Sequence, residues 1–141
     1  METVDHLISF AVIIACIGVA LGLIASNYQP MRPTIDIRAL HNAISAVAFK
    51  PGSKLIVHLY IPETAGLNVT GSVIKVNGAS MPIGFILTAN RSTWIVAEVT
   101  DNSITYKVNF NNLELSGGLT YTLSVECVKP DRVEIRVLGY R

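Results

Sequence analysis

Residues 7–25 read LISFAVIIACIGVALGLIA, and Ser9 is the only polar side chain among them. No charged residue occurs between Leu7 and Met31. A helix rises about 1.5 Å per residue, so about 19 residues cover nearly 30 Å, close to the thickness of the hydrocarbon core of a bilayer. A soluble protein would need a larger core than this chain provides to bury such a helix. The stretch therefore predicts a helix that spans a membrane.

A cleaved secretory signal is the main alternative for an apolar segment near an N-terminus. Such a signal has basic residues before its apolar part and a shorter apolar run. Residues 1–6 read METVDH, which is an acidic segment without Lys or Arg. Flanking Lys and Arg set the orientation of membrane helices. We therefore hypothesise that a basic leader preceded Met1 and was removed, and the alternative is that Met1 is the initiator.

Small residues recur along one side of the predicted helix. Gly18 and Gly22 form a GxxxG pattern, which lets two helices approach closely. In lipid the hydrophobic effect does not drive helices together, so such close approach is a main route to association. We predict a helix–helix contact along this side, whereas the alternative is that membrane helices simply contain more Gly and Ala. The small residues, at spacings of four, three, four and three, are Ala11, Ala15, Gly18, Gly22 and Ala25.

The following segment changes from uniform to periodic hydrophobicity. Pro30 and Pro33 disfavour helix at the residues before them, so we expect an interruption or a kink at residues 30–33. Residues 35–49 predict an amphipathic helix, which a Lys-Pro-Gly sequence ends. His41 lies on this helix, and we expect it at the protein surface. The apolar side of the helix consists of Ile37, Leu40, Ile44 and Val47.

After Ser53 the hydrophobic period changes to two residues, the repeat of a β-strand. Asn77-Gly78 is a strong hairpin signal between two of the expected strands. Seven short strands separated by turns predict a β-sandwich of the immunoglobulin-like kind. The expected strands cover residues 54–61, 72–76, 81–88, 93–100, 103–110, 119–128 and 132–138.

These patterns together predict an α+β protein, in which a long N-terminal hydrophobic helix precedes an all-β immunoglobulin-like sandwich. The length of 141 residues allows one ordinary domain besides the helix. We assign residues 1–50 to the helical part and residues 51–141 to the sandwich.

The remaining composition argues against catalysis. The net charge is +1, so nothing indicates a nucleic-acid partner. The chain contains no paired-carboxylate motif, no Gly-rich phosphate loop and no Cys/His spacing typical of metal sites. Cys16 and Cys127 lie in separate segments, so we predict two free thiols, each buried as a small apolar side chain. We predict no enzymatic activity, no catalytic residue, no metal and no cofactor.

Three further residues carry functional hypotheses. Asn68 and Asn90 begin sequons in predicted loops or strand ends, where N-glycosylation is one interpretation and chance occurrence is the other. Asp5 precedes the apolar run, where the helix dipole favours a carboxylate. A more specific hypothesis is that Asp5 pairs with the free amine of Met1 on a neighbouring subunit, because a buried carboxylate without a partner is costly.

This order of segments resembles the type IV pilin superfamily, and the archaeal pilins and archaellins in particular. The shared layout is an acidic start, a long apolar helix with small residues, an amphipathic continuation and a compact β domain. Residues 43–62, which read AISAVAFKPGSKLIVHLYIP, look like the junction between helix and first strand in that family. Asp5 stands where the bacterial members carry a conserved glutamate.

The resemblance implies a major pilin, which is the structural subunit of an extracellular helical filament with adhesion as its expected role. A processing peptidase would cleave a class III signal peptide, and an assembly machinery would move the subunit from the membrane into a homopolymer. Its partners would be other copies of itself, the membrane before assembly, the peptidase and the machinery. The alternative is a membrane-anchored accessory or minor pilin-like binding module, such as a filament stator or a cell-surface component.

Overall fold

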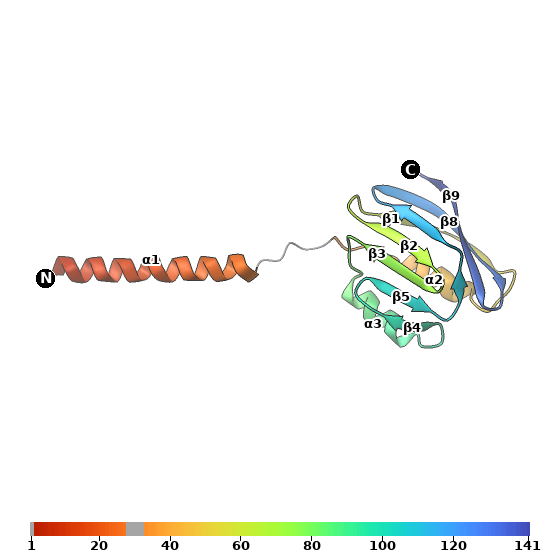
Figure 1. Cartoon of the computed structure of the whole chain (residues 1–141), viewed down its shortest axis with the longest axis horizontal. Coiled ribbons are helices and arrows are strands. Elements are labelled where there is room, and N and C mark those ends of the chain that lie inside the picture. Colours follow the sequence, from red (N-terminus) through yellow and green to blue (C-terminus); the bar gives the residue numbers. More distant parts are fainter. Residues whose placement is uncertain (1, 28–32) are drawn as a thin grey trace. The chain divides into compact units, whose positions relative to one another are not determined.

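The computed structural model describes residues 2–27 and 33–141, with side chains described for residues 3–21 and 33–141. The chain forms two compact units, Met1–Met31 and Arg32–Arg141, which we call the N-terminal unit and the C-terminal unit. The N-terminal unit contains α1 (Glu2–Asn27), which is one uninterrupted helix (Figure 1). Of the residues 30–33, where a kink was expected, residues 30–32 lie outside the described residues.

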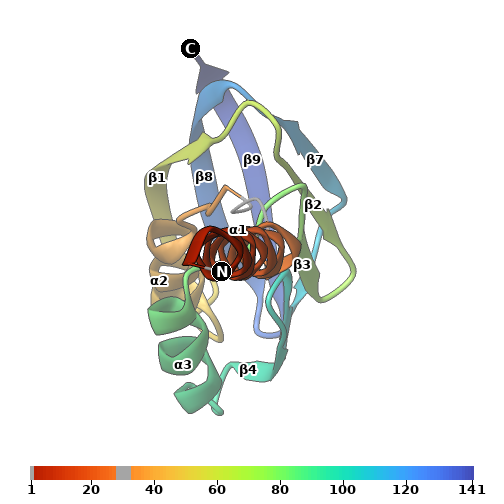
Figure 2. The same ribbon diagram turned by 90° about the vertical axis from the view of Figure 1, so that its left-hand side faces the viewer.

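The C-terminal unit contains two sheets. Neighbouring strands are antiparallel, except that β6 and β9 run parallel. The four-stranded sheet has the order β1 (Lys54–Ile61), β8 (Leu119–Lys129), β9 (Arg132–Tyr140) and β6 (Asn109–Phe110). The five-stranded sheet has the order β4 (Val96–Val99), β5 (Ser103–Tyr106), β3 (Val73–Asn77), β2 (Gly66–Thr70) and β7 (Leu113–Ser116). Figure 2 shows β1, β8 and β9 in one layer and β7, β2 and β3 in the other.

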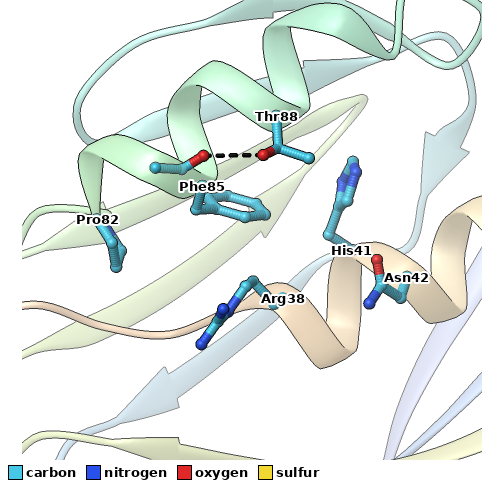
Figure 3. A pocket seen from close by; sticks show the side chains of 7 residues that line it. Arg38, His41, Asn42, Pro82, Phe85 and Thr88 are labelled. Carbon is cyan, nitrogen blue, oxygen red and sulfur yellow. Dashed lines mark hydrogen bonds between the residues drawn. The ribbon is translucent and has the colours of Figure 1, made fainter.

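Two short helices complete the unit, α2 (Arg38–Val47) and α3 (Ile83–Arg91). They lie next to each other, with His41 of α2 facing Phe85 of α3 (Figure 3). The apolar side of α2 is buried and contacts β1 and β8. The sequence predicts a domain boundary between residues 50 and 51, whereas the two compact units divide after Met31. The helix α2 belongs to the C-terminal unit because its apolar side is buried against the sheets.

One hydrophobic core holds the helices and both sheets of this unit together. Full burial of a large aliphatic side chain contributes roughly 1.5–3 kcal/mol, so such side chains dominate the stability of the unit. The largest fully buried side chains are Ile35, Ile37, Leu40, Ile44, Leu59, Ile61, Leu67, Ile74, Ile95, Ile104, Leu123 and Ile135.

The helix expected over residues 35–49 begins only at Arg38. The amide of Ile35 donates to the carbonyl of Ser80 at 3.1 Å, and the amide of Ser80 donates to the carbonyl of Pro33 at 3.1 Å. This bridge-like pairing holds the backbone before α2 extended. Ile35 lies in this extended segment and is buried although it is not helical. The apolar pattern of the sequence therefore begins before the helix does.

The strand expected over residues 81–88 is wrong, because this segment forms α3. The hairpin expected at Asn77-Gly78 is wrong for the same reason, since β3 pairs with β2 and β5 instead. Pro82 precedes the first helical residue, and its carbonyl accepts a hydrogen bond from the amide of Ile86 at 3.0 Å, which begins the helix. Phe85 and Ala89, one turn apart, form the buried side of α3. Two strands, β2 and β7, were not expected, and the strand expected over residues 103–110 is divided into β5 and β6.

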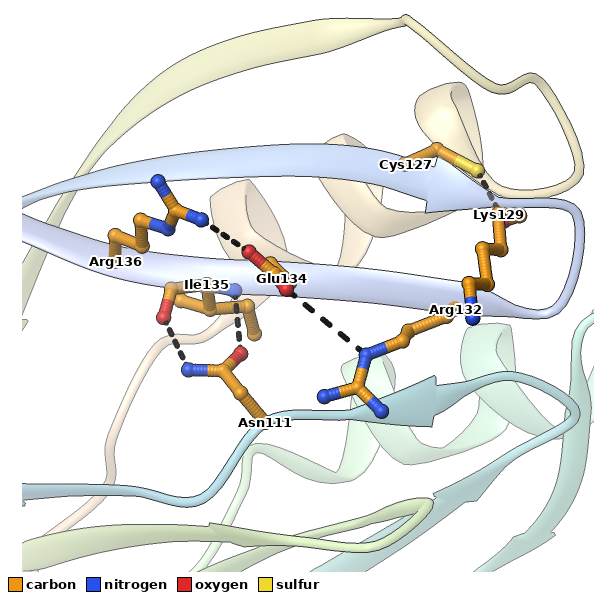
Figure 4. Close-up of polar contacts among 7 residues, drawn as sticks. All are labelled: Asn111, Cys127, Lys129, Arg132, Glu134, Ile135 and Arg136. Atoms are coloured by element: carbon orange, nitrogen blue, oxygen red, sulfur yellow. Dashed lines mark hydrogen bonds and ion pairs between the residues drawn. The ribbon is translucent and has the colours of Figure 1, made fainter.

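A side chain extends the pairing at the edge of the four-stranded sheet (Figure 4). The Asn111 amide nitrogen donates to the Ile135 carbonyl at 2.8 Å, and its amide oxygen accepts from the Ile135 N–H at 2.7 Å. Asn111 thereby continues the short β6–β9 pairing as a strand residue would. The Asn111 side chain therefore links the segment that follows β6 to the strand β9.

Candidate functional site

The surface of α1 is the strongest functional candidate in the chain. Its window Thr3–Leu21 has 19 residues and a mean hydropathy of 2.3, and it is long and apolar enough to cross a membrane. None of this window is buried within the chain. Its backbone hydrogen bonds are internal to the helix, which is the condition for a segment that leaves water.

The large apolar side chains of α1 point outward around the helix, and each is more than half exposed. Burial of each one would contribute roughly 1.5–3 kcal/mol. Contiguous apolar surface of this extent marks a site of contact with a membrane or with other proteins. The side chains are Val4, Leu7, Ile8, Phe10, Val12, Ile13, Ile14, Ile17, Val19 and Leu21.

The five small residues of the predicted contact all lie within α1. Ala11, Ala15 and Gly18 are described with exposed side-chain positions, whereas the side-chain positions of Gly22 and Ala25 lie outside the described residues. Among the described residues, no heavy atom lies within 4 Å of a Cβ atom built on Gly18. The packing of α1 itself therefore does not require glycine at this position. Whether the small residues contact another helix stays a prediction.

Beside these five residues, α1 carries two further small residues that the sequence interpretation missed, Cys16 and Ala20. A shallow apolar hollow of about 430 Å³ runs along the helix between Val12 and Ala20. Ala15 and Cys16 lie within it, because their side chains are shorter than those of Val12 and Val19. Cys16 and Ala20 are four residues apart, which was the available signal. Cys16 is exposed rather than buried, whereas Cys127 is buried as expected and its thiol lies 2.9 Å from the Lys129 carbonyl.

Asp5 lies in the first turns of α1 with an exposed side chain. This position is compatible with the dipole interpretation, because carboxylates are favoured near a helix N-terminus. Met1 lies outside the described residues. The pairing between Asp5 and the amine of a neighbouring Met1 therefore stays a prediction.

The two sequons lie in regular structure rather than in loops or at strand ends. Asn68 is in the middle of β2, half-buried, between Lys75 of β3 and Glu114 of β7. Asn90 is exposed in the last turn of α3. Asn90 is therefore the more accessible of the two, and modification of either residue stays a prediction.

The expectation of a surface position for His41 is wrong, because its side chain is only 5% exposed. Its Nδ1 lies 2.8 Å from the hydroxyl of Tyr106, and its ring meets Phe85 edge-on at a centroid distance of 5.4 Å. The amphipathic pattern places His41 at the border of the apolar side of α2. The helix α3 covers that border, and the sequence pattern predicts a strand where this helix lies.

Burial sets the ionisation of this pair. Loss of solvation lowers the pKa of His41 and raises the pKa of Tyr106. Both groups are therefore neutral near neutral pH. The two side chains form a buried, uncharged hydrogen bond between α2 and β5.

Acidification is expected to destabilise the C-terminal unit through His41. In the unfolded chain the pKa of His41 returns to its ordinary value of 6.5. Below that pH the unfolded state binds one proton more than the folded state, so stability is fully present above it and falls below it by up to about 1.4 kcal/mol per pH unit. Urea unfolding followed by the fluorescence of Trp94 measures this slope. A His41→Gln chain should lose it and a chain with the exposed residue changed, His58→Gln, should keep it; equal slopes in all three chains would contradict the assignment.

No protein-family model, no curated protein and no solved structure matches the chain. Among the described residues, no group of three or more His, Cys, Asp and Glu side chains could hold a metal ion. The surface of α1 and the C-terminal unit are therefore the features of the chain that indicate a function.

Proposed function

We propose that the chain is the major structural subunit of an extracellular helical filament of the type IV pilus kind, with an adhesive role. The observation that carries this proposal is α1, a long apolar helix with no buried side chain in its window Thr3–Leu21. In water this surface is strongly unfavourable, so it requires a cover in every state of the protein. Lipid covers it before assembly, and the helices of other copies cover it in the filament.

The small residues of α1 support a helix-to-helix cover. Ala11, Ala15 and Gly18 let a second backbone approach closely, as small side chains do between membrane helices. The same segment then serves in the membrane and in a bundle, because both surroundings are apolar. A processing peptidase and an assembly machinery are the further partners that this route requires.

We further infer that the C-terminal unit is an immunoglobulin-like sandwich exposed on the filament surface. Its two mainly antiparallel sheets around one core support this proposal. Two features distinguish it from a plain sandwich, namely α3 and the parallel pairing of β6 with β9.

The second candidate is a membrane-anchored accessory or minor pilin-like module. The length of the apolar window supports this candidate, because one membrane-spanning helix is enough to anchor a protein. Shearing of filaments from cells, followed by mass spectrometry of the subunit N-terminus, distinguishes the two candidates. A major subunit is recovered in the sheared fraction with residue 1 at a processed end. An accessory module stays in the membrane fraction.

Asp5→Ala is expected to reduce the yield of sheared filaments at least tenfold. Bringing an unpaired amine into an apolar bundle is far more costly than losing a dipole interaction of roughly 0.3–1 kcal/mol. The yield is measured as the ratio of subunit in the sheared fraction to subunit in the membrane fraction. Asp5→Glu, which keeps the charge, is the matched control and should retain most of the yield. A wild-type yield from Asp5→Ala would leave the dipole interaction as the only role of this residue.

A further inference from the structure

The strand β1 forms one edge of the four-stranded sheet, because it pairs with β8 alone (Figure 2). The amide of Cys127 donates to the carbonyl of Ser53 at 3.0 Å, and the amide of Gly118 donates to the carbonyl of Ile61 at 2.8 Å. Backbone groups alternate in direction along a strand, so the odd-numbered residues of β1 bond to β8 and the even-numbered ones point away from it. The residues whose N–H and C=O groups point away are Lys54, Ile56, His58 and Tyr60.

These outward backbone groups have no hydrogen-bond partner in the part of the chain that the structure describes. A hollow of about 350 Å³ lies beside His58 and Tyr60, and Ala39, with its short side chain, is the one residue of α2 that lines it. The edge is therefore open to another strand. Proteins usually protect such edges with charged side chains, prolines or bulges. Residues 55–61 read LIVHLYI and contain no Lys, Arg, Asp, Glu or Pro, and their pairing with β8 has no bulge.

The sequence of β1 is complementary to itself in an antiparallel pair. Around His58, residues 55–61 have apolar side chains at matching distances on both sides. A two-fold axis at His58 places Ile56 opposite Tyr60 of a second copy, and both residues are 58% exposed before pairing. Cross-strand pairs of an aromatic and a β-branched residue are stabilising. In this register the outward groups of residues 56, 58 and 60 all gain partners, and Pro62, which lacks an N–H, ends the ladder.

We propose that two copies of this chain pair through their β1 edges and join their four-stranded sheets into one continuous sheet. The contact uses the same edge on both copies, so it is isologous and closes at two copies. It buries Ile56 and Tyr60 of each copy against the other. The contact involves the C-terminal unit alone. It therefore goes beyond the helix contacts proposed for α1 and does not depend on them.

Disulfide trapping with the full chain in detergent tests this proposal. In a Cys16→Ser chain the remaining native thiol, Cys127, is buried, and His58→Cys then places one thiol at the proposed axis. Paired residues of this kind have Cα atoms about 5.5 Å apart, which a disulfide can bridge. Mild oxidation should therefore give a covalent dimer on a non-reducing gel. Thr122→Cys, opposite His58 on β8, is the control, because it would lie about 15 Å from its counterpart and should give at least tenfold less dimer.

A second pair of variants tests the edge through a residue that is not cross-linked. Ile56→Lys, added to the His58→Cys chain, places a charge on both sides of the axis and should slow dimer formation at least tenfold. Leu87→Lys is the matched control, since Leu87 lies on α3 with a similar exposure of 57%, and it should leave the rate unchanged.

Three results would overturn the proposal. They are the absence of dimer from the His58→Cys chain, equal amounts of dimer from the His58→Cys and Thr122→Cys chains, and an unchanged rate with Ile56→Lys. Loss of filaments in a Gly18→Ile chain would leave these measurements as they are, so failure of the edge pairing and failure of the proposed filament can be told apart.

Discussion

Gly18→Ile is expected to abolish filament assembly and to leave the C-terminal unit folded. An isoleucine at this position would hold a neighbouring helix away from the α1 backbone, and association in apolar surroundings depends on that close approach. The helix α1 itself tolerates the change, because the space beside Gly18 is open among the described residues. Isoleucine also favours helix more than glycine does, so α1 stays helical. The expected loss therefore reports on contact between chains.

Ser9→Ile is the matched control for this prediction. At about 100° per residue, Ser9 lies about 180° around the helix from Gly18, on the opposite side. The yield of sheared filaments measures the effect, and the stability of the C-terminal unit is checked by the fluorescence of Trp94. Gly18→Ile should yield no filaments, whereas Ser9→Ile should assemble. Filaments of wild-type yield from Gly18→Ile would contradict a packing role for the small residues.

Gly117→Ala is expected to destabilise the C-terminal unit by about 3 kcal/mol, toward the upper end of overpacking effects. A Cβ at Gly117 would overlap the carbonyl oxygens of Pro62 and Ala65 and would lie 2.7 Å from that of Glu63. Backbone atoms cannot turn away as a side chain can, so the loop after β1 would have to move. For a unit of this size the midpoint of thermal unfolding should fall by more than about 10 °C.

Thermal unfolding of the full chain, followed by circular dichroism, checks this prediction. Gly139→Ala is the control, because a Cβ at that position has no heavy atom within 4 Å. The control should change the free energy of unfolding by less than about 0.5 kcal/mol. An unchanged midpoint in Gly117→Ala would show that the loop after β1 yields without cost.

Elements with a strong local pattern could be predicted from the sequence. The helix α1 follows from its uninterrupted apolar run, and β1 was predicted with the bounds Lys54–Ile61 that the structure has. In β1 the inward side chains Leu59 and Ile61 alternate with outward ones, and Pro62 ends the strand. The small residues of α1 could likewise be placed on a helix, because their spacing matches the helical period.

Elements decided by tertiary contacts could not be predicted. The run that forms α3 is short and apolar, and such a run fits a strand and a buried helix equally well. Its helical state becomes favourable through the burial of Phe85 and Ala89 against the rest of the unit. The burial of His41 depends on α3. It could not be predicted, because the sequence pattern predicts a strand where α3 lies. The strand-like role of Asn111 depends on the position of Ile135, which is far away in the sequence.

Cryo-electron microscopy of filaments sheared from cells that produce this chain tests the proposed function most directly. The map should show α1 helices bundled along the filament axis, with the side of Ala11, Ala15 and Gly18 against a neighbouring helix and the C-terminal unit at the surface. Residue 1 should be at a processed end in the same subunits. Filaments that lack this chain, with the unprocessed protein confined to the membrane fraction, would contradict the proposal and favour an anchored accessory module.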